Sequence, residues 1–495
     1  MSGTKFLNID ARGVLRILLG LFLVSPFLIW IWQIPVWRWP DTHEWIPALA
    51  LSLRQALFSA FLAMIAGFVL FLCLQGWNTI RSRKTSEFGL LFPNTMPPLF
   101  LALGLINIVS FAGPFPFGLG AVIAAHVLLN AGLVAISLDR MVFSKLGGIA
   151  ENAWLLGCGR WRFWREVGLP VLQGDLFSLF LFVFSICFTS FSLPLLLGGE
   201  RAVTLEVSIF DAIRTEGRWD LAVLLAFLQV SSLFFLAVIL PQPFWPPRPS
   251  RRSLEFLGWP QARMLVFLPA VLILLGWLGG VAGEINGGFV GEMEAAVPLN
   301  VFVEAILTTL ILGLATGLVS LVLFLLIAFV SPHVGLERFL NGYLAPSPVI
   351  TGFALILIPL ESEGWNLLKA VMSLTLISLP LLYRWMLHSV LAGLRQQVDV
   401  ARLLGASWTQ ILFEIVWPQS AEVILRASGL AALWACGDFA LSEIFLGRAN
   451  TVPLVMAGLI DAYQVDAAQV LMIPLALIGL GVYFLFVMAG RYVSR

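Results

Sequence analysis

Two acidic residues near the end of an apolar segment are the side chains best placed for chemistry in this sequence. Asp438 and Glu443 follow a long apolar run, in the segment Gly437-Asp-Phe-Ala-Leu-Ser-Glu. An ionisable side chain inside a membrane-spanning segment is energetically unfavourable, so its presence there points to transport or binding. Either carboxylate could stabilise a passing cation or line a gate, and Trp434, one helical turn earlier, could add a cation–π surface. Alternatively, both acids are solvated or act as caps at an outer helix end, and Trp434 only packs.

Other reactive groups are scattered along the chain. The four cysteines and four histidines show no CxxC pair and no spacing typical of metal ligands. The sequence contains no G-x-x-x-x-G-K-[ST] loop for nucleotide phosphates and no H-E-x-x-H motif. We therefore expect this chain to hold no metal and no cofactor and to have no enzymatic activity. The net charge of +1 gives no indication of nucleic-acid binding.

The composition identifies the kind of protein that must position these residues. Of 495 residues, 60% are hydrophobic and only 12% are charged, whereas a soluble domain has about 25% charged residues. A helix needs about 20 apolar residues to cross a bilayer, and helices satisfy their backbone hydrogen bonds internally. We therefore predict an all-α polytopic membrane protein with about twelve spans, near 14–34, 47–75, 88–111, 118–138, 172–197, 220–241, 264–282, 300–330, 339–360, 366–387, 420–446 and 466–490.

The distribution of basic residues predicts the orientation. Arginine and lysine follow the second, fourth, sixth and tenth predicted spans and close the chain. Because cytoplasmic loops carry the excess of basic residues, both termini are expected in the cytoplasm.

A polar, glycine-containing segment occurs twice, and the offset between its two copies is constant. Glu151-Asn-Ala-Trp-Leu-Leu-Gly157 runs on to Pro170, and Asp399-Val-Ala-Arg-Leu-Leu-Gly405 runs on to Pro418, so that 405 − 157 = 418 − 170 = 248. We expect each acid to open a short helix, where the helix dipole favours a negative charge. Each glycine then permits a sharp turn, and each proline restarts a span. Six apolar residues are expected to anchor a partner: Trp161, Phe163, Trp164, Trp408, Ile411 and Leu412.

The repeat extends beyond these loops and predicts two halves. Pro98 and Pro346, Gly104 and Gly352, and Gly199 and Gly447 share the offset of 248. We predict a first half over residues 1–241, with its loop at 139–170, and a second half over 263–495, with its loop at 388–418. A proline-rich cytoplasmic linker, 242–262, joins them. Six spans in each half make the repeats parallel, with a transport pathway between them.

The repeated segment resembles the EAA-x3-G-x9-I-x-LP coupling loop of type I ABC importer permeases, in the less common form that fuses two halves in one chain. The resemblance implies that the coupling residues are Glu151, Ala153, Gly157, Pro170, Asp399, Ala401, Gly405 and Pro418. It implies a bacterial inner-membrane protein that needs no second permease chain. Two copies of an ATPase subunit would hold ATP and magnesium, and a periplasmic or lipid-anchored binding protein would deliver the substrate.

Two further segments resemble the thiamine and ferric-iron permease group. One is Cys187-Phe-Thr-Ser-Phe-Ser-Leu-Pro-Leu-Leu-Leu-Gly-Gly199 with the residues after it, and the other is the segment of Asp438 and Glu443. This resemblance favours thiamine or a related small cation, with ferric iron as the alternative. Two other classes of protein fit the sequence poorly, because acids are nearly absent from the span centres and no catalytic motif is present. An ion-gradient-driven transporter would have charged residues deep within its spans, and a membrane enzyme would have a cluster of polar catalytic residues.

Overall fold

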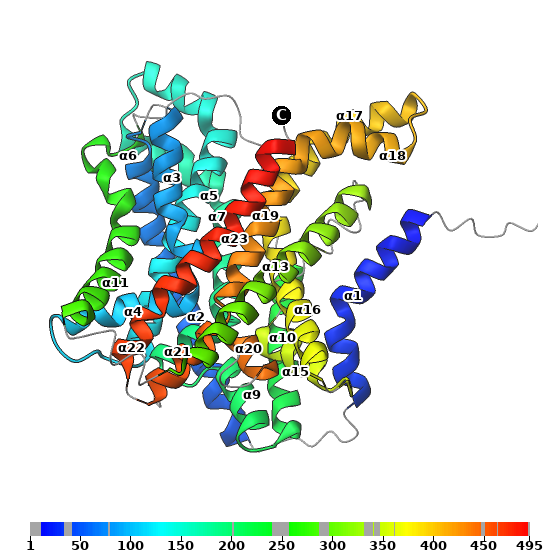
Figure 1. Cartoon of the computed structure of the whole chain (residues 1–495). Coiled ribbons are helices and arrows are strands. Elements are labelled where there is room, and N and C mark those ends of the chain that lie inside the picture. The colour runs from blue at the N-terminus through cyan, green and yellow to red at the C-terminus, as the bar shows by residue number, and fades with distance from the viewer. Residues whose placement is uncertain are drawn as a thin grey trace, which may run out of the picture.

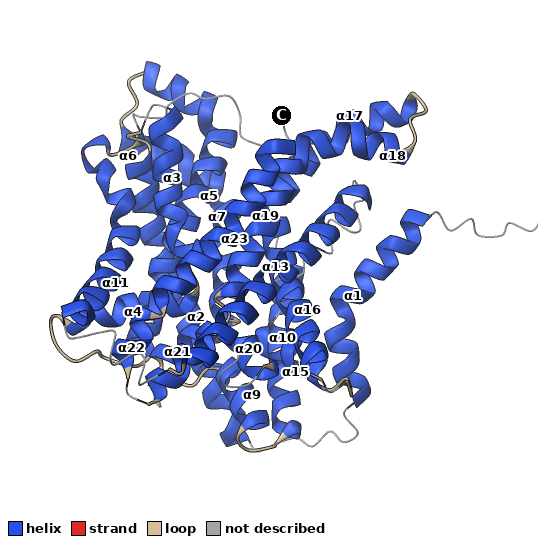
Figure 2. Ribbon diagram, in the orientation of Figure 1, coloured by secondary structure: helices blue, strands red, loops and turns tan. Residues whose placement is uncertain are grey.

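The computed structural model describes residues 11–33, 42–77, 80–199, 202–239, 257–286, 297–330, 340, 347–360, 362–446, 451–462 and 464–493. Within these residues the regular secondary structure is helical (Figure 2), as predicted. Pro346, Gly447 and most of the predicted linker 242–262 lie outside the described residues.

The helices before the linker begin with α1 and end with α10. Their bounds are α1 Ala11–Gln33, α2 Thr42–Leu74, α3 Ile80–Thr95, α4 Pro98–Ser110, α5 Leu119–Leu155, α6 Arg160–Phe163, α7 Leu169–Phe188, α8 Ser192–Leu197, α9 Leu205–Arg214 and α10 Trp219–Ile239. A π-helical turn, Trp164–Gly168, joins α6 to α7.

The helices after the linker follow a closely related order. A 3-10 helix, Pro260–Phe267, leads into α11 Leu268–Asn286, α13 Leu299–Val330, α15 Pro348–Ile356, α16 Glu363–Leu382, α17 His388–Leu403, α18 Trp408–Gln410, α19 Trp417–Cys436, α20 Ala440–Phe445, α21 Val452–Asp461, α22 Val465–Val470 and α23 Met472–Val493. Two further π-helical turns occur, Tyr383–Leu387 between α16 and α17 and Ile411–Val416 between α18 and α19.

The chain is an all-helical, multi-pass membrane protein, but the predicted count of twelve spans is not confirmed. In the described residues, seven helices are long and apolar enough to cross a membrane, or eight if the bent pair α3 and α4 is one span. The predicted span 420–446 is not among these helices: α19 ends at Cys436, and Glu422 and Arg426 make it less apolar than the helices that qualify. The predicted span 339–360 lies partly outside the described residues. Its described part contains α15, which has nine residues.

One predicted span is broken. The prediction of a single helix over 88–111 is wrong, because α3 and α4 meet at 97°. Pro97 and Pro98 stand at the break. Proline lacks the backbone donor and disfavours helical geometry in the residue before it, so two prolines in succession stop α3 and start α4 in a new direction.

The first helix on each side of the linker packs against the other side. α1 lies against α15 and α13, whereas α11 lies along α4 and α3 (Figure 1). Around these contacts, α2 packs on α5 and α7, and α19 packs on α13 and α23. The two groups of helices are thus joined by a reciprocal exchange.

The helix boundaries keep the offset seen in the sequence. α6 and α18 begin at 160 and 408, α7 and α19 end at 188 and 436, and α8 and α20 begin at 192 and 440. Each of these pairs differs by 248. The turn between α5 and α6, the turn between α17 and α18, and the end of α23 lie at the same end of the molecule (Figure 1).

Candidate functional site

The two repeated segments end their long helices in the same way. α5 stops at Leu155, and Gly157 has φ 74°; α17 stops at Leu403, and Gly405 has φ 85°. Cys158 N–H donates to the Ala153 carbonyl at 2.9 Å. Gly157 N–H donates to the Trp154 carbonyl at 2.9 Å. These two bonds form a Schellman motif, which places a left-handed residue, most readily glycine, just beyond the helix.

The second copy repeats this motif residue for residue. Ala406 N–H donates to the Ala401 carbonyl at 3.0 Å, and Gly405 N–H donates to the Arg402 carbonyl at 3.0 Å. Ala153 and Ala401 therefore act through their carbonyl oxygens, and their half-buried methyl groups pack against the core. A side chain at either glycine would meet open space, so the requirement for glycine is conformational.

The prediction that each acid opens a short helix is wrong. Glu151 lies in the last turns of α5, and Asp399 lies in the last turns of α17, so neither opens a short helix. The reason is that neither helix is interrupted before its glycine: α5 continues unbroken for 37 residues, well beyond the predicted end of the span at 138.

The predicted role of the two prolines also needs correction. Pro170 and Pro418 lie inside continuous helices, directly after a π-helical turn. Leu169 N–H bonds to the Trp164 carbonyl, and Trp417 N–H bonds to the Leu412 carbonyl, one residue farther back than in an α-helix. The wider turn precedes a proline, which cannot donate to the helix. Each proline thus continues a helix that has already begun.

The two loops differ in their stabilising side chains. In the second copy, Ser407 and Gln410 form a capping box, in which Ser407 N–H donates to Gln410 Oε1 at 2.9 Å and Ser407 Oγ accepts from Gln410 N–H. The first copy has Gly159 at this position and no such cap, but Arg162 pairs with Glu166 at 2.9 Å. The backbone path is therefore shared while its local stabilisation is not.

Both loops expose a leucine pair beside the glycine. Leu155 and Leu156 are 76% and 86% exposed, and Leu403 and Leu404 are 87% and 83% exposed. Exposed apolar groups that cluster in this way mark interaction surfaces. These leucines were not among the predicted anchor residues, although Leu-Leu-Gly stands in both copies.

The six predicted anchor residues differ in how exposed their side chains are. Trp161 is exposed, as expected. Phe163, Trp164 and Ile411 are buried, whereas Trp408 and Leu412 are half-buried. The predicted anchoring surface is therefore wrong for the buried residues, because the widened turn continues the helix and directs them into the core.

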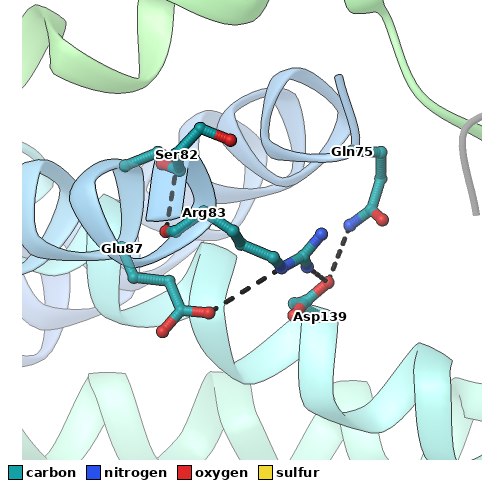
Figure 3. A network of polar contacts seen from close by, with 6 residues as sticks. Gln75, Ser82, Arg83, Glu87 and Asp139 are labelled. Carbon is teal, nitrogen blue, oxygen red and sulfur yellow. Dashed lines mark hydrogen bonds and ion pairs between the residues drawn. The ribbon is translucent and has the colours of Figure 1, made fainter. Parts of the chain in front are cut away.

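Polar contacts hold the base of the first loop (Figure 3). Asp139 of α5 accepts hydrogen bonds from Arg83 of α3 and from Gln75 Nε2, the latter at 2.7 Å. Arg83 also pairs with Glu87, with 3.8 Å between Arg83 Nε and Glu87 Oε1. Lys145, also in α5, pairs with Asp175 of α7, with 2.6 Å between Lys145 Nζ and Asp175 Oδ2. The position of the loop is thereby tied to α2, α3 and α7.

A central cavity of about 270 Å³ brings together two of the three predicted pathway residues. Trp434 and Asp438 line it, and Glu443 does not. Asp438 Oδ2 accepts from the N–H groups of Leu441 and Ser442, each at 2.9 Å, at the start of α20. The carboxylate is therefore both a cap and a wall of the cavity. Trp434 Nε1 donates to the Asn94 carbonyl at 3.0 Å.

A buried carboxylate also connects the two groups of helices. Glu206 of α9 accepts from Ser347 Oγ, at the start of α15, at 2.9 Å. It also accepts from Gln229 Nε2 at 2.5 Å. Burial raises the pKa of the Glu206 carboxyl to about 7, opposed by hydrogen bonds from Ser347, Gln229 and the backbone of Val349. This carboxylate thus satisfies donors on both sides.

We expect Glu206→Leu to lower the free energy of unfolding by about 3 kcal/mol, because it leaves buried donors without an acceptor. The melting temperature of the detergent-solubilised protein measures this effect. Glu206→Gln keeps one acceptor oxygen and should lie between the wild type and the leucine variant. Equal melting temperatures for all three would contradict the assigned role.

Comparison with known proteins is consistent with this arrangement. Residues 338–495 match the model of the family described as binding-protein-dependent transport system inner membrane component. The chain is 24% identical over 491 residues to the thiamine transport system permease protein ThiP of Brucella abortus (strain 2308), covering 88% of this chain and 86% of that protein. It is 23% identical over 490 residues to ThiP of Salmonella typhimurium, covering 90% and 88%. It is 25% identical over 341 residues to ThiP of Escherichia coli (strain K12), covering 62% and 61%.

No solved structure matches the chain. A binding-protein-dependent transport system implies ATPase and binding-protein partners, and its permease component is not itself an enzyme. This chain is the inner-membrane permease of a binding-protein-dependent ABC importer, related to the ThiP permeases over most of its length.

Proposed function

We propose that this chain imports thiamine or a closely related small cation, which it accepts from a periplasmic or lipid-anchored binding protein. The observation that carries the proposal is the match to ThiP proteins over about nine-tenths of both chains. A largely apolar cavity with one carboxylate and two tryptophans among its lining residues adds support, because such surroundings suit an organic cation.

We further propose that the chain comprises two six-helix halves, residues 1–241 and 263–495, with both termini in the cytoplasm and no second permease chain. The helix boundaries that recur at an offset of 248 support this division. The orientation is supported by the basic residues that accompany the loops, since Arg160, Arg162 and Arg165 follow one turn and Arg402 precedes the other.

In the proposed mechanism, a movement of each loop is transmitted to the cavity along the long helix that follows the loop. Residues 160–188 and 408–436 are continuous helices that begin at the two loops. A helix of 29 residues is about 43 Å long, and these helices carry Phe182, Ile186 and Trp434 to the cavity. In this mechanism two ATPase subunits each hold ATP and magnesium, and each binds one leucine pair. When the two subunits close on each other, they would therefore move the walls of the cavity.

The test is uptake of labelled thiamine in cells with and without this chain, with ferric iron in parallel. We expect deletion to abolish thiamine uptake, and to leave iron uptake unchanged. Depletion of ATP should stop transport, whereas an uncoupler applied at constant ATP should not. Loss of iron uptake alone would transfer the protein to the ferric-iron importers, and sensitivity to the uncoupler alone would indicate an ion-gradient-driven transporter.

A further inference from the structure

The central cavity lies between the two repeats. Several of its lining residues come in pairs that differ by 248: Leu129 and Ile377, Asn130 and Ser378, Leu133 and Leu381, Ile186 and Trp434, and Ser192 and Ala440. A cavity lined by equivalent positions of both repeats must lie near the axis that relates them. This is where a transported molecule passes in a protein built from two parallel repeats.

The polar residues on this cavity include three with acceptor oxygens, alongside the hydroxyls of Ser192 and Ser378. Among the described residues that line it, Asp438 is the one ionisable side chain. The Oδ1 atoms of Asn94 and Asn130 are buried and have no hydrogen-bond partner. The orientation of the Asn130 amide follows from its other end, since Nδ2 donates to the His126 carbonyl at 2.9 Å. A buried acceptor without a donor is unfavourable, but both oxygens are covered by neighbouring atoms. A ligand that donates would therefore reach them after a local shift of the lining side chains.

Aromatic side chains supply the remaining recognition. Trp434 and Trp385 line the cavity, and indole faces attract cations more strongly than other aromatic rings. Phe182 also lines it, but the guanidinium of Arg384 lies over that ring at 5.1 Å, so this ring already has a cation. Arg384 itself is not among the lining residues. The two tryptophans and Phe439 are therefore the rings available to a ligand, and indole is the stronger partner for a cation.

We propose that this cavity is a binding site, within the permease itself, for an organic cation that also carries N–H donors. Asp438 pairs with the positive charge, the carbonyl oxygens of Asn94 and Asn130 accept from the donors, and Trp434 and Trp385 flank the ligand. The volume of about 270 Å³ lies near the lower end of small-molecule sites, which span about 300–1,000 Å³. The choice of thiamine, with its thiazolium charge and amino group, as the probe rests on the proposed function.

The experiment measures equilibrium binding of radiolabelled thiamine to the permease with its ATPase subunits in lipid nanodiscs, without the binding protein. Wild type is expected to bind saturably. Asp438→Asn removes the charge but keeps an oxygen for the Leu441 and Ser442 amides, and should weaken binding at least about tenfold. Glu363→Gln, which removes an exposed carboxylate at the start of α16, is the matched control and should bind as wild type does.

Two further variants copy the residue that the other repeat already carries at the equivalent position. Asn130→Ser reproduces Ser378, and Trp434→Ile reproduces Ile186. Each should weaken thiamine binding about three- to tenfold, measured on protein whose melting curve shows that it remains folded at the assay temperature. These two variants decide the matter if Asp438→Asn proves unstable.

The outcomes separate this inference from the proposed function. Normal thiamine uptake in cells, combined with no binding by the wild-type complex or equal binding by all variants, overturns the inference and leaves the proposed function standing. Saturable binding that the three variants weaken, in a protein whose deletion leaves thiamine uptake intact, supports the site and overturns the proposed function.

Discussion

Replacing Gly157 and Gly405 together by valine is expected to abolish ATP-driven uptake while the chain still inserts into the membrane. Both glycines have φ values in the left-handed region, 74° and 85°. A residue with a β-carbon is destabilised there by about 1–2 kcal/mol, and a β-branched residue by more. The substitution therefore acts on the turn that closes each Schellman motif, and the adjacent leucine pairs should lose their position.

Asparagine offers a matched control for this prediction. It tolerates the left-handed conformation better than other non-glycine residues, and open space surrounds both positions. The double asparagine variant should retain most of the uptake. Membrane insertion is checked by the amount of protein in the membrane fraction. Undiminished ATP-driven transport in the valine variant would refute the role assigned to these turns.

The leucine pairs give the second large effect. Changing Leu155, Leu156, Leu403 and Leu404 to serine should release the ATPase subunits from the purified complex and reduce uptake to background. Full burial of one leucine contributes about 1.5–3 kcal/mol, so removing two at each loop eliminates most of the apolar contact. Because all four side chains are more than three-quarters exposed, the melting temperature of the permease alone should not change.

Comparison of the two loops refines this test. Serine pairs introduced in one loop at a time should each reduce ATPase retention, since the leucine pairs are matched in sequence and exposure. Leu360→Ser is the control, because Leu360 is also exposed but follows α15, away from both loops. Retention of the ATPase by the fourfold variant would show that docking depends on other residues.

The sequence was sufficient to predict the positions of the loops but not their internal geometry. The constant offset of 248 identified both segments because equivalent positions are compared directly along the chain. The direction in which Phe163 and Trp164 point depends on the π-helical turn, and a pattern with a period of 3.6 residues cannot reveal an inserted residue. The exposed leucines were visible as a repeated Leu-Leu-Gly, and their significance became clear only with the turn that presents them.

The cavity was predictable only in part. Trp434 and Asp438 stood out because an acid beside an apolar run is unusual. Asn94 and Asn130 did not, since an asparagine gains importance only when packing leaves its carbonyl oxygen without a donor. The exchange of α1 and α11 was likewise hidden, because apolar composition predicts the length of a helix and not the neighbour on which it packs.

That exchange has a consequence for how the protein is made. α1 leaves the ribosome early, but α15, on which it packs, begins 348 − 33 = 315 residues after α1 ends. At about 5–20 residues per second, α1 waits in the membrane for roughly 15 to 60 s before its partner exists. α1 is thus synthesised long before it can dock on α15, and until then its apolar surface is available to lipid, to insertion factors or to another nascent chain.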